Sequence, residues 1–259
     1  MPASSPSFKD QTLKMVSRLA SRGERMSASL RARIDPSATP APDGSDGDDG
    51  RYGELWNPGN ATDAIDQIYN TRDMESFEHG GQFDFETLSP YISKSTTVLD
   101  FGCGIGRLAK YVAPACKELW AVDVSAHMLK LAAQRLAEFD NVRLVQSKDT
   151  GIPDVPTASI DLVYSLLVLQ HVEREDAFVL LEELRRVLRP DGRAVLNFPN
   201  LLNDGYLEGF VHYAHTGASS QANRARVYTP QEVERIVTAA GFDVEIEEKT
   251  EIWAFATPR

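Results

Sequence analysis

From residue 96 onwards the chain alternates two patterns of apolar and polar positions. Nearly continuous apolar runs, typical of parallel strands covered on both faces by helices, lie at about 96–101, 118–124, 141–147, 160–165 and 193–198. Stretches with the spacing of amphipathic helices lie at about 105–114, 125–138, 173–189 and 230–240. Two further β-runs fall within residues 242–258. With right-handed crossovers, this order predicts an α/β fold with an open, doubly wound, seven-stranded sheet that binds its ligand at the carboxyl ends of the strands.

The first apolar run leads into a glycine-rich segment, D-F-G-C-G-I-G-R, at residues 100–107. Its pattern indicates a strand, a tight loop and a helix. Glycines let a backbone approach a ligand closely, and the helix start offers free N–H groups. Dinucleotide-binding loops have the spacing G-x-G-x-x-G. Here the third glycine comes one residue earlier, which argues against a nicotinamide-dependent oxidoreductase.

The second predicted strand ends in Asp123, about twenty residues after the first glycine. A carboxylate at this spacing in a βαβ unit reaches a ribose diol. Together, D-F-G-C-G-I-G-R and A-V-D-V-S-A-H-M-L resemble class I S-adenosylmethionine (SAM)-dependent methyltransferases. The resemblance continues through S-I-D-L-V-Y-S-L-L-V-L-Q-H-V and L-R-R-V-L-R-P-D-G-R-A-V-L-N-F and covers about residues 98–258. It implies a Rossmann-like sheet, mostly parallel with an antiparallel terminal strand, with SAM as cofactor and S-adenosylhomocysteine as product.

The resemblance also implies which residues hold the cofactor. Asp100 would orient the loop or contact the amino group of SAM, and Asp123 would accept hydrogen bonds from both ribose hydroxyls. The methionine part would lie on Gly102, Gly104 and Gly106. Val124 and Met128 would pack on the adenine, although Met128 also suits plain helix packing.

Two further positions complete the expected cofactor site. Where related enzymes often place an acid for the adenine amino group, this chain has Lys148, with Asp149 one residue later. Either Asp149 or the backbone would then make that contact. Ser165 ends the fourth predicted strand, which faces the methyl group in this fold.

Methyl transfer requires an aligned acceptor and, for a hydroxyl, a base. His171 lies just after the fourth strand and would deprotonate a hydroxyl at neutral pH; the alternative is a structural histidine or one that touches the cofactor. The weaker alternatives are His79, His212 and His215. The fourth strand ends neither in an N-P-P-Y-type motif nor in the carboxylate of Mg²⁺-dependent catechol-type enzymes. We therefore expect a reaction without a metal.

Three segments outside the core pattern suggest the domain organisation. Residues 1–50, basic and then rich in Pro, Gly, Ser and Asp, predict a disordered tail, with a basic amphipathic helix as the alternative. Residues 51–95 predict a helical cap, and residues 200–227 a cap insertion within the SAM-binding domain at 96–259. The cap candidates for the acceptor site are Trp56, Tyr69, His79 and Phe83, each of which could instead pack on the core.

Composition limits the partners. The net charge of −11 argues against a protein that wraps nucleic acid. The absence of an apolar run of about 18 residues argues against a membrane span, and two cysteines without a C-x-x-C motif argue against a zinc site. No signal peptide is evident, so a cytoplasmic location is expected; a homodimer is left open.

The expected function is methyl transfer to a small-molecule acceptor. The resemblance favours a hydroxyl of a sugar, a glycolipid or a secondary metabolite. N- or C-methylation of a small metabolite, or a methyltransferase-fold protein that binds SAM without catalysis, are the alternatives.

Overall fold

The computed structural model describes residues 50–53, 55–69, 71–216 and 225–259. The predicted tail at 1–50 lies outside the described residues except for Gly50, so its role stays a prediction. Within the described ranges no helix is both long and apolar enough to cross a membrane. No cluster of three or more His, Cys, Asp or Glu side chains suited to a metal ion occurs among these residues either.

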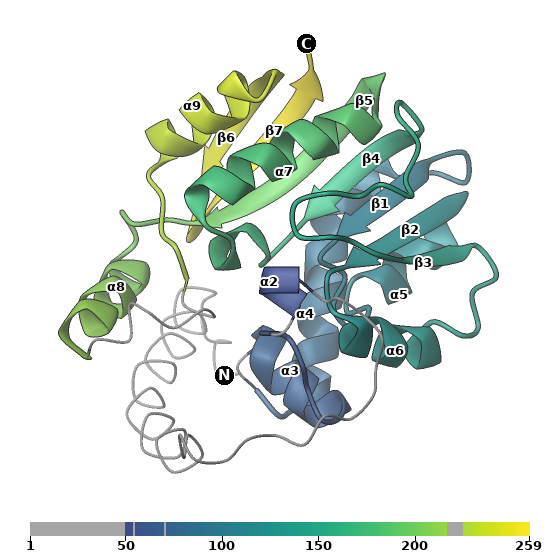
Figure 1. Ribbon diagram of the computed structural model, residues 1–259, viewed down its shortest axis with the longest axis horizontal. Coiled ribbons are helices and arrows are strands. Elements are labelled where there is room, and N and C mark those ends of the chain that lie inside the picture. Colours follow the sequence, from purple (N-terminus) through teal and green to yellow (C-terminus); the bar gives the residue numbers. More distant parts are fainter. Residues whose placement is uncertain (1–49, 54, 70, 217–224) are drawn as a thin grey trace, which may run out of the picture.

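The sheet has seven strands in the order β3-β2-β1-β4-β5-β7-β6 (Figure 1). They are β1 (Thr97–Phe101), β2 (Glu118–Asp123), β3 (Val142–Gln146), β4 (Ile160–Ser165), β5 (Leu188–Pro199), β6 (Phe242–Glu248) and β7 (Glu251–Pro258). The pairs among β1 to β5 are parallel, and β7 runs antiparallel to both β5 and β6. This confirms the predicted doubly wound sheet with an antiparallel terminal strand.

Strand β5 begins earlier than the sequence suggested. The pattern predicted a helix to 189 and a strand from 193, but α7 ends at Val187 and β5 starts at Leu188. The register against β4 jumps from Leu188 to Arg193, and the residues between include Pro190, which has no N–H to donate to a neighbouring strand. Because the helical spacing of apolar residues continues to about residue 189, the sequence pattern did not reveal where this irregular strand begins.

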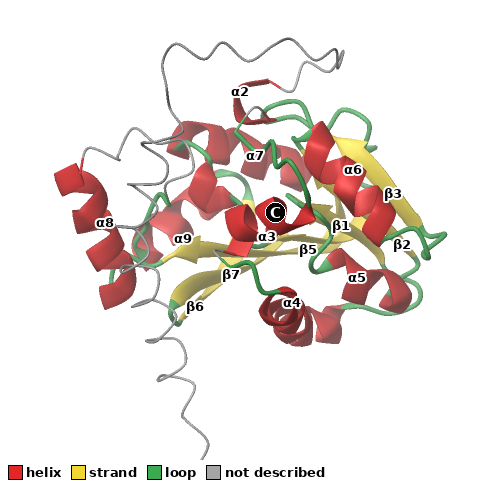
Figure 2. Cartoon of the chain, turned by 90° about the horizontal axis from the view of Figure 1, so that it is seen from below, coloured by secondary structure: helices red, strands yellow, loops and turns green. Residues whose placement is uncertain are grey.

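Helices cover both faces of the sheet. They are α2 (Gly50–Gly53), α3 (Ala61–Tyr69), α4 (Met74–Leu88), α5 (Ala109–Val112), α6 (Ala126–Arg135), α7 (Arg174–Val187), α8 (Asp204–Thr216) and α9 (Pro230–Ala239). Apolar residues of α7 and α9 form one core with the sheet, and those of α4, α5 and α6 form the other. Figure 2 shows α4 and α5 on one side of the sheet and α7 on the other. Every residue of β1 is buried, as expected for a strand covered on both faces.

A third, smaller core attaches the helices that precede the sheet. Ile65 of α3 and Phe77 of α4 pack with Ile105 of the glycine loop and Met128 of α6. The helices predicted as a cap therefore contact the loop that begins the ligand-binding edge. In contrast, α8 lies in the predicted insertion and has no buried residue.

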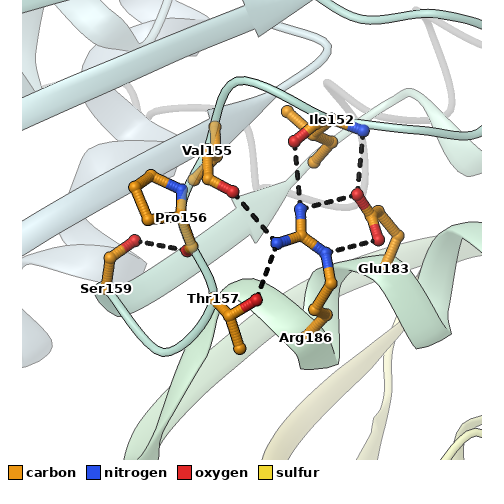
Figure 3. A network of polar contacts seen from close by, with 7 residues as sticks. All are labelled: Ile152, Val155, Pro156, Thr157, Ser159, Glu183 and Arg186. Carbon is orange, nitrogen blue, oxygen red and sulfur yellow. Dashed lines mark hydrogen bonds and ion pairs between the residues drawn. The ribbon is translucent and has the colours of Figure 1, made fainter.

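The connection from β3 to β4 is held by Arg186 of α7 (Figure 3). Its guanidinium donates to the carbonyls of Ile152 and Val155 at 3.0 Å each and pairs with Glu183, whose carboxylate accepts from the Ile152 N–H at 3.0 Å. This bidentate arrangement satisfies the backbone of an irregular segment. It fixes the chain directly after the turn that carries Asp149.

Candidate active site

A cavity lies at the carboxyl ends of the central strands, where the fold predicts a ligand. Eight of the eleven residues predicted for the cofactor and for catalysis line it: Asp100, Gly102, Gly104, Asp123, Val124, Met128, Asp149 and His171. Three others do not. Gly106 closes the loop beneath the cavity, Lys148 pairs with Gly151 in a turn, and the Ser165 side chain is fully buried.

The glycine loop turns sharply beneath the cavity. Gly102, Gly104 and Gly106 have φ angles of +78°, +54° and +84°, the left-handed region that glycine adopts at no steric cost. A Cβ atom on Gly102 would lie 2.2 Å from Cγ2 of Val168. The loop is therefore packed against the segment after β4, and glycine is needed there for space as well as conformation.

Asp123 holds this loop in place from the end of β2. Its Oδ2 accepts a hydrogen bond from the Gly104 N–H at 2.8 Å, and its Oδ1 accepts from the Ser125 N–H at 2.9 Å. Burial raises the pKa of the Asp123 carboxyl to about 6, against the lowering effect of these hydrogen bonds. Each carboxylate oxygen can accept more than one hydrogen bond, so both keep capacity for a ligand.

Two buried ionisable groups that line the cavity have unused polar atoms. Among the described residues, Oδ2 of Asp100 and Nη1 of Arg107 have no hydrogen-bond partner. Burial raises the pKa of Asp100 to about 7, although the Tyr164 hydroxyl and the Arg107 charge lower it. Arg107 pairs through Nη2 with Asp84 at 2.7 Å. Because buried polar atoms are normally satisfied, these two suit a ligand with one cationic and one anionic group.

The segment before α3 crosses the cavity. The Tyr52 hydroxyl donates to Asp176 and accepts from the Glu173 N–H at 3.2 Å, near the start of α7. The Trp56 carbonyl accepts from the hydroxyl of Ser125, the N-cap of α6. This segment thus joins α7 to α6 and covers the cavity. Trp56 was predicted here, whereas Tyr52 was not.

The other aromatic and histidine candidates lie elsewhere. Tyr69 packs on the Arg107 guanidinium, with 5.2 Å from its ring centroid to Cζ. His79 and Phe83 are exposed on α4, and His212 and His215 lie on α8. None of these side chains lines the cavity described above.

The segment after β4 forms the wall of the cavity next to the glycine loop. Leu166, Leu167 and Val168 line the cavity, and Leu167 has a φ of +64°, which is strained for a branched apolar residue. His171 ends the short 3₁₀ turn that follows. Its ring meets that of Trp56 edge-on, with centroids 4.8 Å apart, and its Nε2 lies 3.0 Å from Nε2 of Gln170. The imidazole therefore faces the cavity and also supports the covering segment.

Residues 99–196 match the family described as "Methyltransferase domain". Residues 99–196 therefore carry a methyltransferase domain. The chain is 34% identical over 132 residues to an uncharacterized methyltransferase of Mycobacterium tuberculosis, covering 50% of this chain and 62% of that protein. It is 34% identical over 108 residues to demethylmenaquinone methyltransferase of Staphylococcus aureus, covering 40% and 43%. The chain thus spans less than two thirds of the length of these relatives.

Solved structures share the fold of this methyltransferase domain. A SAM-dependent methyltransferase from Aquifex aeolicus superposes with a TM-score of 0.55 at 19% identity, covering 72% of this chain and 94% of that one. The complex of DhpI with S-adenosylhomocysteine gives a TM-score of 0.55 at 19% identity, covering 75% and 92%. At this identity the likeness shows the fold, and it makes SAM the cofactor to test against the cavity.

The unused atoms in the cavity fit this cofactor. The methionyl part of SAM carries an ammonium and a carboxylate, which match Oδ2 of Asp100 and Nη1 of Arg107 in charge. Sequence reasoning missed Arg107, although it directly follows the third glycine. The arginine itself could have indicated this role, because it lies where the fold buries the chain and a buried charge needs a partner.

Proposed function

We propose that the chain transfers the methyl group of SAM to a hydroxyl of a small molecule such as a sugar, a glycolipid or a secondary metabolite. The observation that carries the proposal is the pair of unpartnered buried atoms on Asp100 and Arg107, in one cavity with Asp123. The relative named demethylmenaquinone methyltransferase also supports a small-molecule acceptor.

Each residue would bind a different group of the cofactor. Asp100 accepts from the amino group, Arg107 donates to the carboxylate, and Asp123 accepts from the ribose hydroxyls. When bound, SAM supplies an electrophilic methyl group on a sulfonium. The three acids that line the cavity, Asp100, Asp123 and Asp149, complement the positive charge of the sulfonium and the ammonium. Tyr52 and Trp56, which line the cavity, would exclude water from their side of the site and so strengthen these interactions.

His171 would act on the acceptor. Its ring lines the cavity on the side of β4, and a neutral imidazole there takes the proton of a hydroxyl as the oxygen attacks. Gln170 and Trp56 hold the ring, so its orientation is set before the acceptor arrives.

Cofactor binding is expected to release protons in mildly acidic solution. With a pKa of about 7, Asp100 is mostly protonated in the free protein below neutrality, but contact with an ammonium group requires the carboxylate. Affinity for SAM should therefore rise with pH through that pKa. At about pH 6.5, calorimetric titrations in buffers of different ionisation enthalpy should show release of about one proton, most of it from Asp100.

The Asp100→Asn variant is the control for this release, because its amide does not titrate. It should bind SAM more weakly and lose most of the effect, leaving the smaller share of Asp123, whose pKa is about 6. Proton uptake on binding, or the same release from both proteins, would show that Asp100 does not contact the amino group.

The acceptor is tested by the release of S-adenosylhomocysteine from SAM in the presence of sugars, phenols, quinol-type compounds and amines. We expect hydroxyl compounds to stimulate the release. Stimulation by amines alone would contradict O-methylation, and stimulation by none of a broad set would favour a SAM-binding protein without catalysis.

A further inference from the structure

Helix α8 is hydrogen-bonded to the sheet through the carboxylate of Glu251. The helix has no buried residue, and Figure 1 shows it set apart from the layers that cover the sheet. Its Tyr206 nevertheless reaches back, and the hydroxyl donates to Oε1 of Glu251 at 3.0 Å. Glu251 is the first residue of β7 and lies opposite Pro199, the last residue of β5. The contact is therefore at the carboxyl edge of β5, the edge where the cavity lies.

The same carboxylate also binds a side chain of the sheet. Oε2 of Glu251 accepts from Nδ2 of Asn197 at 2.5 Å. Burial raises the pKa of Glu251 to about 7, while Tyr206 and Asn197 lower it. The ion pair of Asp84 and Arg107 acts on this pKa as well, with Asp84 raising it and Arg107 lowering it. Nothing in the proposed reaction so far uses this carboxylate.

Glu251 determines which way the Asn197 amide faces. A carboxylate only accepts hydrogen bonds, so the NH₂ group of Asn197 must turn towards it. The amide oxygen then points the other way, where it accepts from the Leu167 N–H at 2.8 Å. Leu167 is the cavity residue with a φ of +64°, a conformation that persists only where surrounding contacts enforce it.

We propose that Glu251 is a positioning residue that ties α8 to the cavity wall at Leu167. Three hydrogen bonds run in sequence from Tyr206 through Glu251 and Asn197 to the Leu167 N–H. Helix α8 and the cavity turn at Leu167 are thus held by one group. In the context of the proposed function, the group that holds α8 also holds the wall of the cofactor cavity.

The chain of bonds predicts a distinct effect for each variant of the protein. Glu251→Leu leaves both donors unpaired, so amide hydrogen exchange should accelerate in α8 and at residues 166–168. Tyr206→Phe should affect α8 only, and Asn197→Ala the Leu167 turn only. Affinity for S-adenosylhomocysteine should fall about three- to tenfold in Glu251→Leu and Asn197→Ala, the loss of one buried hydrogen bond, and stay unchanged in Tyr206→Phe.

The Glu251→Gln variant tests whether Glu251 acts by positioning its neighbours or through its negative charge. Its amide oxygen can accept from Asn197 while its NH₂ donates to the Tyr206 hydroxyl oxygen, so exchange and affinity should return to within about twofold of the native protein. The exposed Glu245 of β6 gives the matched control, because Glu245→Leu should change neither region.

Three results would overturn the proposal: Glu251→Gln behaving like Glu251→Leu, Glu251→Leu affecting one region only, or Tyr206→Phe and Asn197→Ala each affecting both. If the Glu251→Leu variant fails to fold, Tyr206→Phe and Asn197→Ala test the proposal. If the native protein does not bind S-adenosylhomocysteine, the proposed function fails, while the exchange measurements still decide whether Glu251 positions the two segments.

Discussion

Replacing His171 with alanine is expected to lower the turnover of a hydroxyl acceptor by about 10²–10⁴-fold, the usual contribution of a general base. A sugar hydroxyl is a very weak acid, so its oxygen attacks slowly unless the proton is removed. SAM affinity should change little, because the imidazole is not among the groups proposed to hold the cofactor. The measurement is the initial rate of S-adenosylhomocysteine release at saturating SAM, together with a SAM titration.

The His171→Phe variant distinguishes a catalytic base from a ring that only supports the covering segment. The ring of His171 meets Trp56 edge-on, and phenylalanine keeps an aromatic ring there but cannot accept a proton. If His171 is the base, both variants should be about equally slow. A phenylalanine variant with nearly native turnover would show that the ring only supports the covering segment, and equal loss of SAM affinity in both would place His171 against the cofactor.

Replacing Gly104 with valine should weaken SAM binding by about 10²-fold or more, from the combined cost of backbone strain and overpacking. Gly104 has a φ of +54°, and a Cβ atom there would lie 2.8 Å from Cδ1 of Ile68. Its N–H also donates to Asp123. A displaced loop would therefore move the carboxylate that is proposed to bind the ribose. Calorimetric titration with S-adenosylhomocysteine measures the loss.

Gly59→Val is the matched control for this variant. Gly59 lies outside the loop with an ordinary φ, and its added Cβ would be 3.5 Å from the nearest heavy atom, an ordinary contact. It should bind the cofactor like the native protein. Native affinity in a folded Gly104→Val protein would mean that the cofactor does not lie on this loop.

Much of the fold was predictable because parallel strands covered on both faces are apolar throughout. The five parallel runs, the terminal hairpin and the glycine loop each follow from local pattern. Asp123 was predictable for the same reason, since a βαβ unit fixes the spacing between the loop and the second strand. The early start of β5 was not, because a proline-containing strand with a register shift has no clean period.

The parts of the site that escaped prediction depend on contacts between distant segments. Tyr52 reaches the cavity through Asp176, 124 residues away along the chain.

On β4, side chains alternate between faces, so Tyr164 lines the cavity whereas the predicted Ser165 does not. Likewise, at the end of β3 the cavity residue is Asp149, while the backbone of Lys148 closes the turn. In both pairs, Tyr164 with Ser165 and Lys148 with Asp149, only one of two adjacent residues lines the cavity. The periodicity of the sequence alone does not determine which one.

The most direct test is a calorimetric titration of the native protein with SAM, repeated with the Arg107→Leu variant. The account predicts one site per chain. It also predicts at least about tenfold weaker binding in the variant, because Nη1 loses a charge-assisted hydrogen bond to the ligand carboxylate. Near-ultraviolet circular dichroism checks that the variant is folded, since Arg107 also pairs with Asp84. Absence of binding by the folded native protein, or equal affinity in the two proteins, would contradict the assignment of this cavity to SAM.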